Sequence, residues 1–120
     1  MATVAAVVAA LKEFNERNCH VVTWEALTAA NAVGAVIEMG ASADRTVQFS
    51  GVWNSATAVL QGSNDNVTWF TLTDPQGNAI SATADKIEMI SEATRYIRPS
   101  TSGGGASEDI DCIVFMKKVR

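Results

Sequence analysis

The chain has few of the residues that build metal centres. Its 120 residues include a single histidine, His20, which lies next to Cys19. Zinc is held by several nitrogen and sulfur ligands, and neighbouring residues on a strand point to opposite faces. This pair therefore supports a zinc site poorly, and we expect neither a metal ion nor another cofactor.

Cysteine is scarce as well. Cys19 and Cys112 are far apart in the sequence and too few to form a disulfide scaffold. We expect two free thiols, made in a reducing cytoplasm. Cys112 stands inside an apolar run, where cysteine behaves as a small core residue.

Basic residues are outnumbered by acidic ones. Nine Lys and Arg against thirteen Asp and Glu give a formal net charge of −4. Nucleic-acid binding requires a basic patch, and the only basic cluster is Lys117, Lys118 and Arg120 at the C-terminus. We interpret that cluster as a solvated chain end and expect no nucleic-acid partner.

Long hydrophobic runs are also missing. The apolar stretch at residues 2–11 has no basic segment before it and ends at Lys12 and Glu13. It is too short to cross a bilayer and does not match a signal peptide. These features predict a soluble, non-exported protein with no membrane partner.

The chain does have the composition of one folded domain, with 48% hydrophobic and 18% charged residues. Residues 3–17 show the spacing of one apolar helix face. The side chains at i, i+3, i+4 and i+7 are Val4, Val7, Val8 and Leu11. Because valine also suits a strand, residues 1–18 are expected to form either a helix or an extended arm, ahead of a domain over residues 19–120.

From residue 19 onward the pattern is one of short strands and turns. Residues 45–53 alternate in polarity, which indicates a half-buried strand. The strand at 95–98 is expected to end at Pro99, which has no amide to donate. Other strand candidates are 20–24, 35–39, 57–61, 67–72, 80–83, 87–90 and 110–119. Such a series predicts an all-β fold, a sandwich or barrel with at most one helix.

The last strand candidate is apolar on both faces. Ile113 and Phe115 alternate with Ile110, Cys112, Val114 and Met116. A strand of this kind is either central and covered on both sides or packed against another subunit. We therefore take Ile113 and Phe115 as candidate contacts with a subunit or capsid, together with the N-terminal Val4, Val7, Val8 and Leu11.

No constellation of catalytic residues can be named. The carboxylates lie in or beside turns, where Asp and Asn bond to their own backbone. Asn64-Asp65-Asn66 offers oxygen ligands for calcium but lacks the spaced motif of a calcium loop. Gly103-Gly104-Gly105 lacks the lysine of a phosphate loop. Because no nucleophile, base and orienting group can be identified together, we expect that the protein is not an enzyme.

Aromatic residues are the remaining candidates for ligand contact. Trp24, Trp53, Trp69 and Tyr96 form a possible platform for glycans. Aromatic side chains on a β-sandwich stack on sugars in some proteins, but they more often fill the core or a subunit contact. Both interpretations stay open at this point.

The hairpin at residues 60–72 resembles that of discoidin-like sandwiches that bind sugars or lipids. Their Gly-Ser-Asn-Asp-Gly…Trp pattern is present here with Asn66 in place of the final glycine. Asparagine tolerates the left-handed conformation, so the turn survives the change. This resemblance implies an alternative function as a carbohydrate-binding module.

A longer resemblance is to the head decoration, or cement, proteins of tailed bacteriophages. It rests on an ordered set of segments: residues 21–24, 44–48, 60–72, 74–78 and 95–99. The resemblance implies a jelly-roll-like β-sandwich that is not an enzyme. It also implies homotrimers that bind the major capsid protein outside the capsid, at threefold and local threefold positions, and stabilise the shell. The resemblance implies that the protein is made in the host cytoplasm and then binds the virion surface. The Ala- and Val-rich N-terminus of this chain departs from the pattern of the family.

Overall fold

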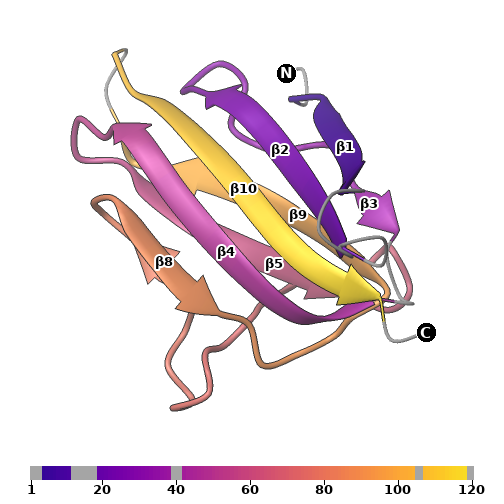
Figure 1. The fold of residues 1–120 in the computed structure, drawn as a ribbon. Helices are drawn as coiled ribbons and strands as arrows, with labels where there is room; N and C mark the ends of the chain where they lie inside the picture. Colours follow the sequence, from indigo (N-terminus) through magenta and orange to yellow (C-terminus); the bar gives the residue numbers. More distant parts are fainter. Residues whose placement is uncertain (1–3, 12–18, 39–41, 105–106, 119–120) are drawn as a thin grey trace.

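The computed structural model describes residues 4–11, 19–38, 42–104 and 107–118. These residues form two antiparallel sheets that face each other as a β-sandwich (Figure 1). They contain no helix. The predicted all-β, single-domain sandwich is therefore confirmed.

The first sheet has five strands in the order β1-β2-β10-β4-β8. Their bounds are β1 Ala6–Leu11, β2 Cys19–Leu27, β10 Asp109–Lys118, β4 Ser42–Val52 and β8 Lys86–Met89. The C-terminal strand β10 thus lies in the middle of the sheet, between β2 and β4 (Figure 1). This central position accounts for the apolar residues of β10 that face the core.

The second sheet has the order β3-β9-β5-β6, and β7 also pairs with β5. The bounds are β3 Ile37–Glu38, β9 Tyr96–Ser102, β5 Thr57–Ser63, β6 Phe70–Thr71 and β7 Ser81–Ala82. Only β5 and β9 are long, and they lie behind the first sheet (Figure 1). The short strands around them supply the sheet's edges.

The core lies between the sheets and is built from alternate residues of the long strands. Fully buried side chains include Val22, Trp24, Leu60, Ile97, Ile110, Cys112, Val114 and Met116. Burying a large apolar side chain of this kind contributes about 1.5–3 kcal/mol. Cys112 and Cys19 are both free thiols, as expected, and burial raises the pKa of Cys112 above its ordinary value.

The N-terminal segment departs from the predicted helix. Residues Ala6–Leu11 form strand β1, which pairs antiparallel with β2 from Ala6 opposite Trp24 to Leu11 opposite Cys19. The helix prediction is wrong for these residues, and the extended alternative is correct. The edge of β2 offers unpaired backbone groups, and β-branched valines suit the strand that pairs with them. Residues 12–18 of the predicted helix lie outside the described residues.

Strand β9 also continues past the residue expected to end it. Pro99 lies opposite Leu60 of β5, within the paired region. The Leu60 carbonyl accepts from the amide of Leu72 (2.9 Å), so it points away from β9 and needs no donor there. On its other side, the Pro99 carbonyl accepts from the amide of Gly34 (2.9 Å). The missing amide therefore falls where β9 loses no hydrogen bond to β5.

Gly51 allows β4 to pair closely with β10. Its φ is +134°, and a Cβ atom there would lie 2.2 Å from the carbonyl oxygen of Asp109. We predict that Gly51→Ala lowers the free energy of unfolding by roughly 1–3 kcal/mol, measured by urea denaturation, because alanine disfavours this backbone and collides with β10.

The matched control is Gly77→Ala, at a turn where φ is +86° and no atom lies within 4 Å of the added Cβ. It carries the backbone strain without the collision, so its loss of stability should be smaller. Equal losses in the two variants would contradict the close approach of Asp109.

Candidate functional site

The first sheet turns one face to the core and the other away from the sandwich. The register of the strands aligns two rows of residues across the outward face of the first sheet. One row is Val7, Thr23, Ile113, Gln48 and Ile87. The next row is Val21, Phe115, Thr46 and Met89. We call the large hydrophobic residues of both rows the outer apolar face: Val7, Val21, Ile87, Met89, Ile113 and Phe115.

These side chains are accessible. Val7, Ile87 and Met89 are 60%, 64% and 51% exposed, and the other three are half-buried. The polar residues between them are uncharged. A sheet that faces water usually alternates apolar inside with polar outside, so an apolar outer face marks a surface for contact with another molecule.

Strand β8 has its polarity reversed relative to an ordinary edge strand. Ile87 and Met89 point outward, whereas Lys86 and Glu88 point toward the opening between the sheets and form an ion pair of 2.7 Å. Charged residues that point inward at an edge discourage pairing with another strand. The exposed apolar side chains of β8 are therefore available to a partner that covers the face rather than the edge.

The structure brings together three of the predicted contact residues. Val7, Ile113 and Phe115 all lie on the outer apolar face. Val4 lies elsewhere: its amide donates to the Val33 carbonyl (2.9 Å) and its side chain packs against the core. Val8 and Leu11 pair through their backbones with Val22 and Cys19, and their side chains lie outside the described part of the chain.

The predicted aromatic platform is not a single surface. Trp24 is fully buried, with its Nε1 donating to the Ala35 carbonyl (2.9 Å), so it belongs to the core. Trp53 donates to Asp85 Oδ1 (2.8 Å) and meets the edge of Phe49, with ring centroids 6.5 Å apart. Both fit the core interpretation of the aromatic residues.

Of the other two aromatic residues of the platform, Tyr96 lies on β9 and Trp69 in the hairpin just before β6, and both lie under arginine side chains. The Arg98 guanidinium lies 4.2 Å from the ring centroid of Trp69, and that of Arg95 lies 5.1 Å from the centroid of Tyr96. Arg98 also donates to Gln61 Oε1 (2.8 Å). Such cation–π contacts hold a charged group against each ring and reduce its access to a ligand.

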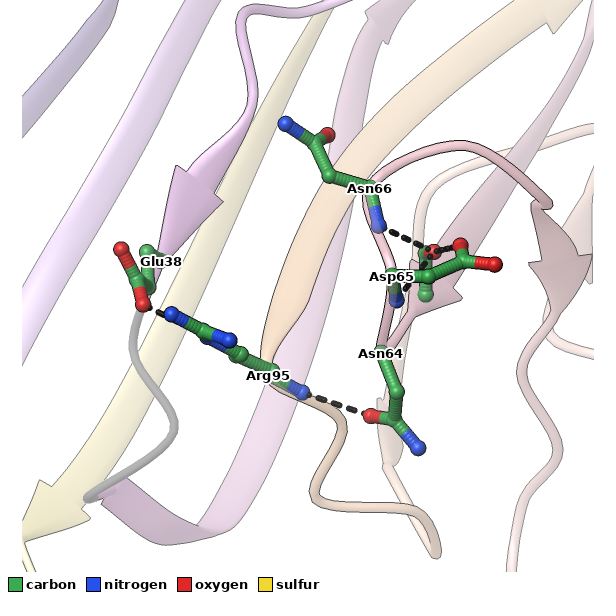
Figure 2. A network of polar contacts seen from close by, with 6 residues as sticks. Glu38, Asn64, Asp65, Asn66 and Arg95 are labelled. Atoms are coloured by element: carbon green, nitrogen blue, oxygen red, sulfur yellow. Dashed lines mark hydrogen bonds and ion pairs between the residues drawn. The ribbon is translucent and has the colours of Figure 1, made fainter.

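The hairpin after β5 is fixed by side-chain acceptors (Figure 2). Asp65 Oδ1 accepts from the amides of Val67 and Thr68 (2.9 Å each) and from Ser63 Oγ (2.8 Å). These hydrogen bonds hold the pKa of Asp65 at about 2. Because the two amides face Asp65, they cannot join a ladder, and the return strand expected at 67–72 is reduced to β6.

A second set of contacts anchors the hairpin to β9. Asn64 Oδ1 accepts from the amide of Arg95 (3.0 Å), and Arg95 Nε donates to Glu38 Oε2 (2.7 Å) (Figure 2). Two of the oxygen atoms considered for calcium, Asn64 Oδ1 and Asp65 Oδ1, are thus already used as hydrogen-bond acceptors. Among the described residues, no three His, Cys, Asp or Glu side chains converge as a metal site requires.

An open pocket of about 330 Å³ lies beside this hairpin. Phe70, which is 66% exposed, lines it together with Asn64, Asp65 and Glu92. Glu92 accepts hydrogen bonds from the amide and hydroxyl of Thr73, which lower its pKa although burial opposes them. Sequence reasoning missed Phe70, whose only signal is its place next to Trp69.

Within the described part of the chain, no helix is long and apolar enough to cross a lipid bilayer. No protein-family model and no curated protein sequence matches this chain.

Among solved structures, the chain is similar to the SPBc2 prophage-derived protein YomS, with a TM-score of 0.58 and 13% identity over 82% of this chain and 93% of that one. It also matches a family 89 glycoside hydrolase from Clostridium perfringens (TM-score 0.44, 11% identity, 94% of this chain, 14% of that one). A third match is the K2 cleaved adhesin domain of Lys-gingipain (TM-score 0.46, 8% identity, 98% of this chain, 83% of that one). At these identities, the similarity to YomS establishes the fold alone.

The hairpin carries a testable pH dependence. The folded-state pKa of Asp65 lies below its ordinary value of 3.8, so the carboxylate stabilises the turn above about pH 4 and loses that effect as the pH falls toward 2. In an NMR titration, we expect the Asp65 carboxyl and the Val67 and Thr68 amides to share a midpoint near 2. Asp65→Asn should abolish the response of both amides. A shared midpoint near 3.8 would contradict the lowered pKa of Asp65 and the hydrogen bonds that cause it.

Proposed function

We propose that this protein is a structural component of a bacteriophage particle. It binds the outside of the capsid as a homotrimer, at threefold and local threefold positions, and stabilises the shell by contacting the major capsid protein. The observation that carries the proposal is the outer apolar face, which a monomer leaves in contact with water. The protein is made in the host cytoplasm and acts on the virion surface without catalysis.

The chemistry of the outer apolar face favours a protein partner. Its rows combine large aliphatic and aromatic side chains with Thr23, Thr46 and Gln48, and no charge lies within them. Protein contact surfaces have such apolar centres, depleted of charge. A fold shared with a protein of prophage origin is consistent with a role in a phage particle.

The stabilising mechanism is mass action. A protein that binds the assembled shell and not its dissociated subunits shifts the equilibrium toward the shell, and many copies add their contributions. A trimer closes a ring through heterologous contacts, in which two different surfaces of each subunit meet. Such a role requires defined surfaces and a rigid scaffold, which the central strands of the sandwich supply.

The first experiment is quantitative mass spectrometry of gradient-purified virions, in which this chain is measured against the major capsid protein. A copy number comparable to that of the capsid protein is expected for a lattice decoration. Its absence, or only a few copies, would overturn the proposal.

A second candidate function, carbohydrate binding, is favoured by the pocket beside the hairpin. Phe70 offers an exposed ring, while Asn64 and the carboxylates of Asp65 and Glu92 offer polar groups around it. An aromatic ring combined with hydrogen-bonding groups is the usual recognition chemistry for a sugar. In this function the ligand platform is Phe70 and its pocket, because arginine side chains lie over Trp69 and Tyr96.

Two matched substitutions separate the candidates. Phe115→Asp places a carboxylate on the outer apolar face, where burial against a protein leaves it unpaired, so virion occupancy should fall at least tenfold. Phe70→Asp changes the exposed aromatic residue of the pocket and should leave occupancy unchanged. If Phe115→Asp leaves virion occupancy unchanged and glycan-array binding is lost only in Phe70→Asp, the results would favour the carbohydrate-binding module. Thermal unfolding of both variants checks that they fold.

A further inference from the structure

The outward-pointing residues of β10 follow an ordered chemical pattern. Burial alternates along the strand, so Asp111, Ile113, Phe115 and Lys117 all point away from the core. Their order is acidic, apolar, apolar, basic. Asp111 and Lys117 are six residues apart, which separates them by about 20 Å at the rise of a strand.

This pattern is complementary to its own reversal. If β10 is turned end for end about Val114, Asp111 comes opposite Lys117 and Ile113 comes opposite Phe115. A twofold contact requires this reciprocity, because residue i meets residue j and j meets i. We propose that a second copy of this chain packs face to face on the outer apolar face, about a twofold axis that runs between the two sheets, roughly perpendicular to β10 and over Val114.

The neighbouring strands support the same arrangement. Glu25 is exposed on β2 at the acidic end, next to Ala26, whose amide donates to Asp111 Oδ1 (3.0 Å). At the other end, Lys117 lies between Cys19 and Ala43 and is exposed. Each end of one copy therefore meets a charge of opposite sign on the other, which favours this orientation over a parallel one.

The dimensions of packed sheets allow these contacts. Two sheets pack about 10 Å apart with their strands within about 30° of each other. At about 10 Å from the axis, a crossing of 30° displaces the facing ends by about 5 Å, a distance that a lysine side chain spans. The inward ion pair of β8 discourages pairing through that edge of the sheet, so this edge does not compete with the face-to-face contact.

This contact does not depend on the proposed trimer. It covers the same face that the proposed function places against the capsid, so it belongs to the free protein and is exchanged for the capsid contact on the shell. A trimer ring uses heterologous contacts, whereas this contact is isologous. Chains that make only the twofold contact form dimers, and chains that make both form assemblies of an even number of trimers. The mass of the assembly thus reports the two contacts separately.

The test measures the mass of the full chain by light scattering over a range of concentrations, for wild type, Lys117→Asp, Asp111→Lys and the double variant. Wild type should show an even number of subunits. Lys117→Asp should raise the dissociation constant of the twofold contact at least tenfold, because it sets a carboxylate opposite Asp111. The double variant should recover most of the association, because the charges then face each other in exchanged positions.

Rescue is the decisive outcome. Asp111→Lys removes the acceptor of the Ala26 amide, so a loss in that single variant can follow from reduced stability, which thermal unfolding detects. Recovery of association in the double variant cannot follow from reduced stability. Asn66→Asp, at the exposed hairpin between β5 and β6 of the second sheet, controls for added negative charge.

Three results would overturn the twofold contact: a wild-type mass that is not an even multiple of the subunit, an assembly unaffected by Lys117→Asp, or no recovery in the double variant. If the twofold contact is overturned and the number of subunits in the wild-type assembly is divisible by three, the data would support the trimer contact only. An even number of subunits that is not divisible by three would support the twofold contact and count against the trimer.

Discussion

The register of β10 between β2 and β4 is the constraint on which the rest of the structure depends. β10 pairs with both neighbours over most of its length, so their facing residues are set by its alternation. A slip of one residue would turn four buried side chains outward and bring Asp111 and Lys117 toward the core. Core and outer face are therefore specified together, and neither can change without the other.

A strand of this fold could be predicted from the sequence when its own residues define its two faces. Strand β4 and strand β10 were predictable because each alternates over enough residues to define two faces. The same alternation separated Ile113 and Phe115 from the four residues on the other face of β10, although both sets are apolar. Strand β8 was different: Lys-Ile-Glu-Met alternates equally well with either face inward. Only its pairing with β4, which aligns Ile87 with Gln48 and Met89 with Thr46, decides that the apolar side chains point out.

The predictions that failed depended on the hydrogen-bond partners of particular backbone groups. Residues 6–11 carry a helical spacing, but the pairing partner that makes them a strand is β2, whose paired residues lie 8 to 18 positions along the chain. Pro99 is compatible with its strand because its missing amide faces Gly34 rather than β5. The return strand is short because Asp65 takes two of its amides. In each case the deciding fact is where a backbone amide points, which periodicity does not record.

The two sheets treat their outward aromatic and aliphatic residues differently. On the second sheet, Trp69 and Tyr96 each lie under an arginine side chain that carries charge to the surface. On the first sheet, Phe115 and the aliphatic side chains around it have no such cover among the described residues.

The exposed edge of β8 has its own protection against pairing, in the inward ion pair of Lys86 and Glu88. The chain thus uses one device to shield Trp69 and Tyr96 and another to guard an edge, and applies neither to the outer apolar face. Exposed apolar surface costs solubility unless a partner covers it. Its concentration on the outer apolar face, bounded by opposite charges at the two ends of β10, is the strongest physical reason to assign that face to contact between protein chains.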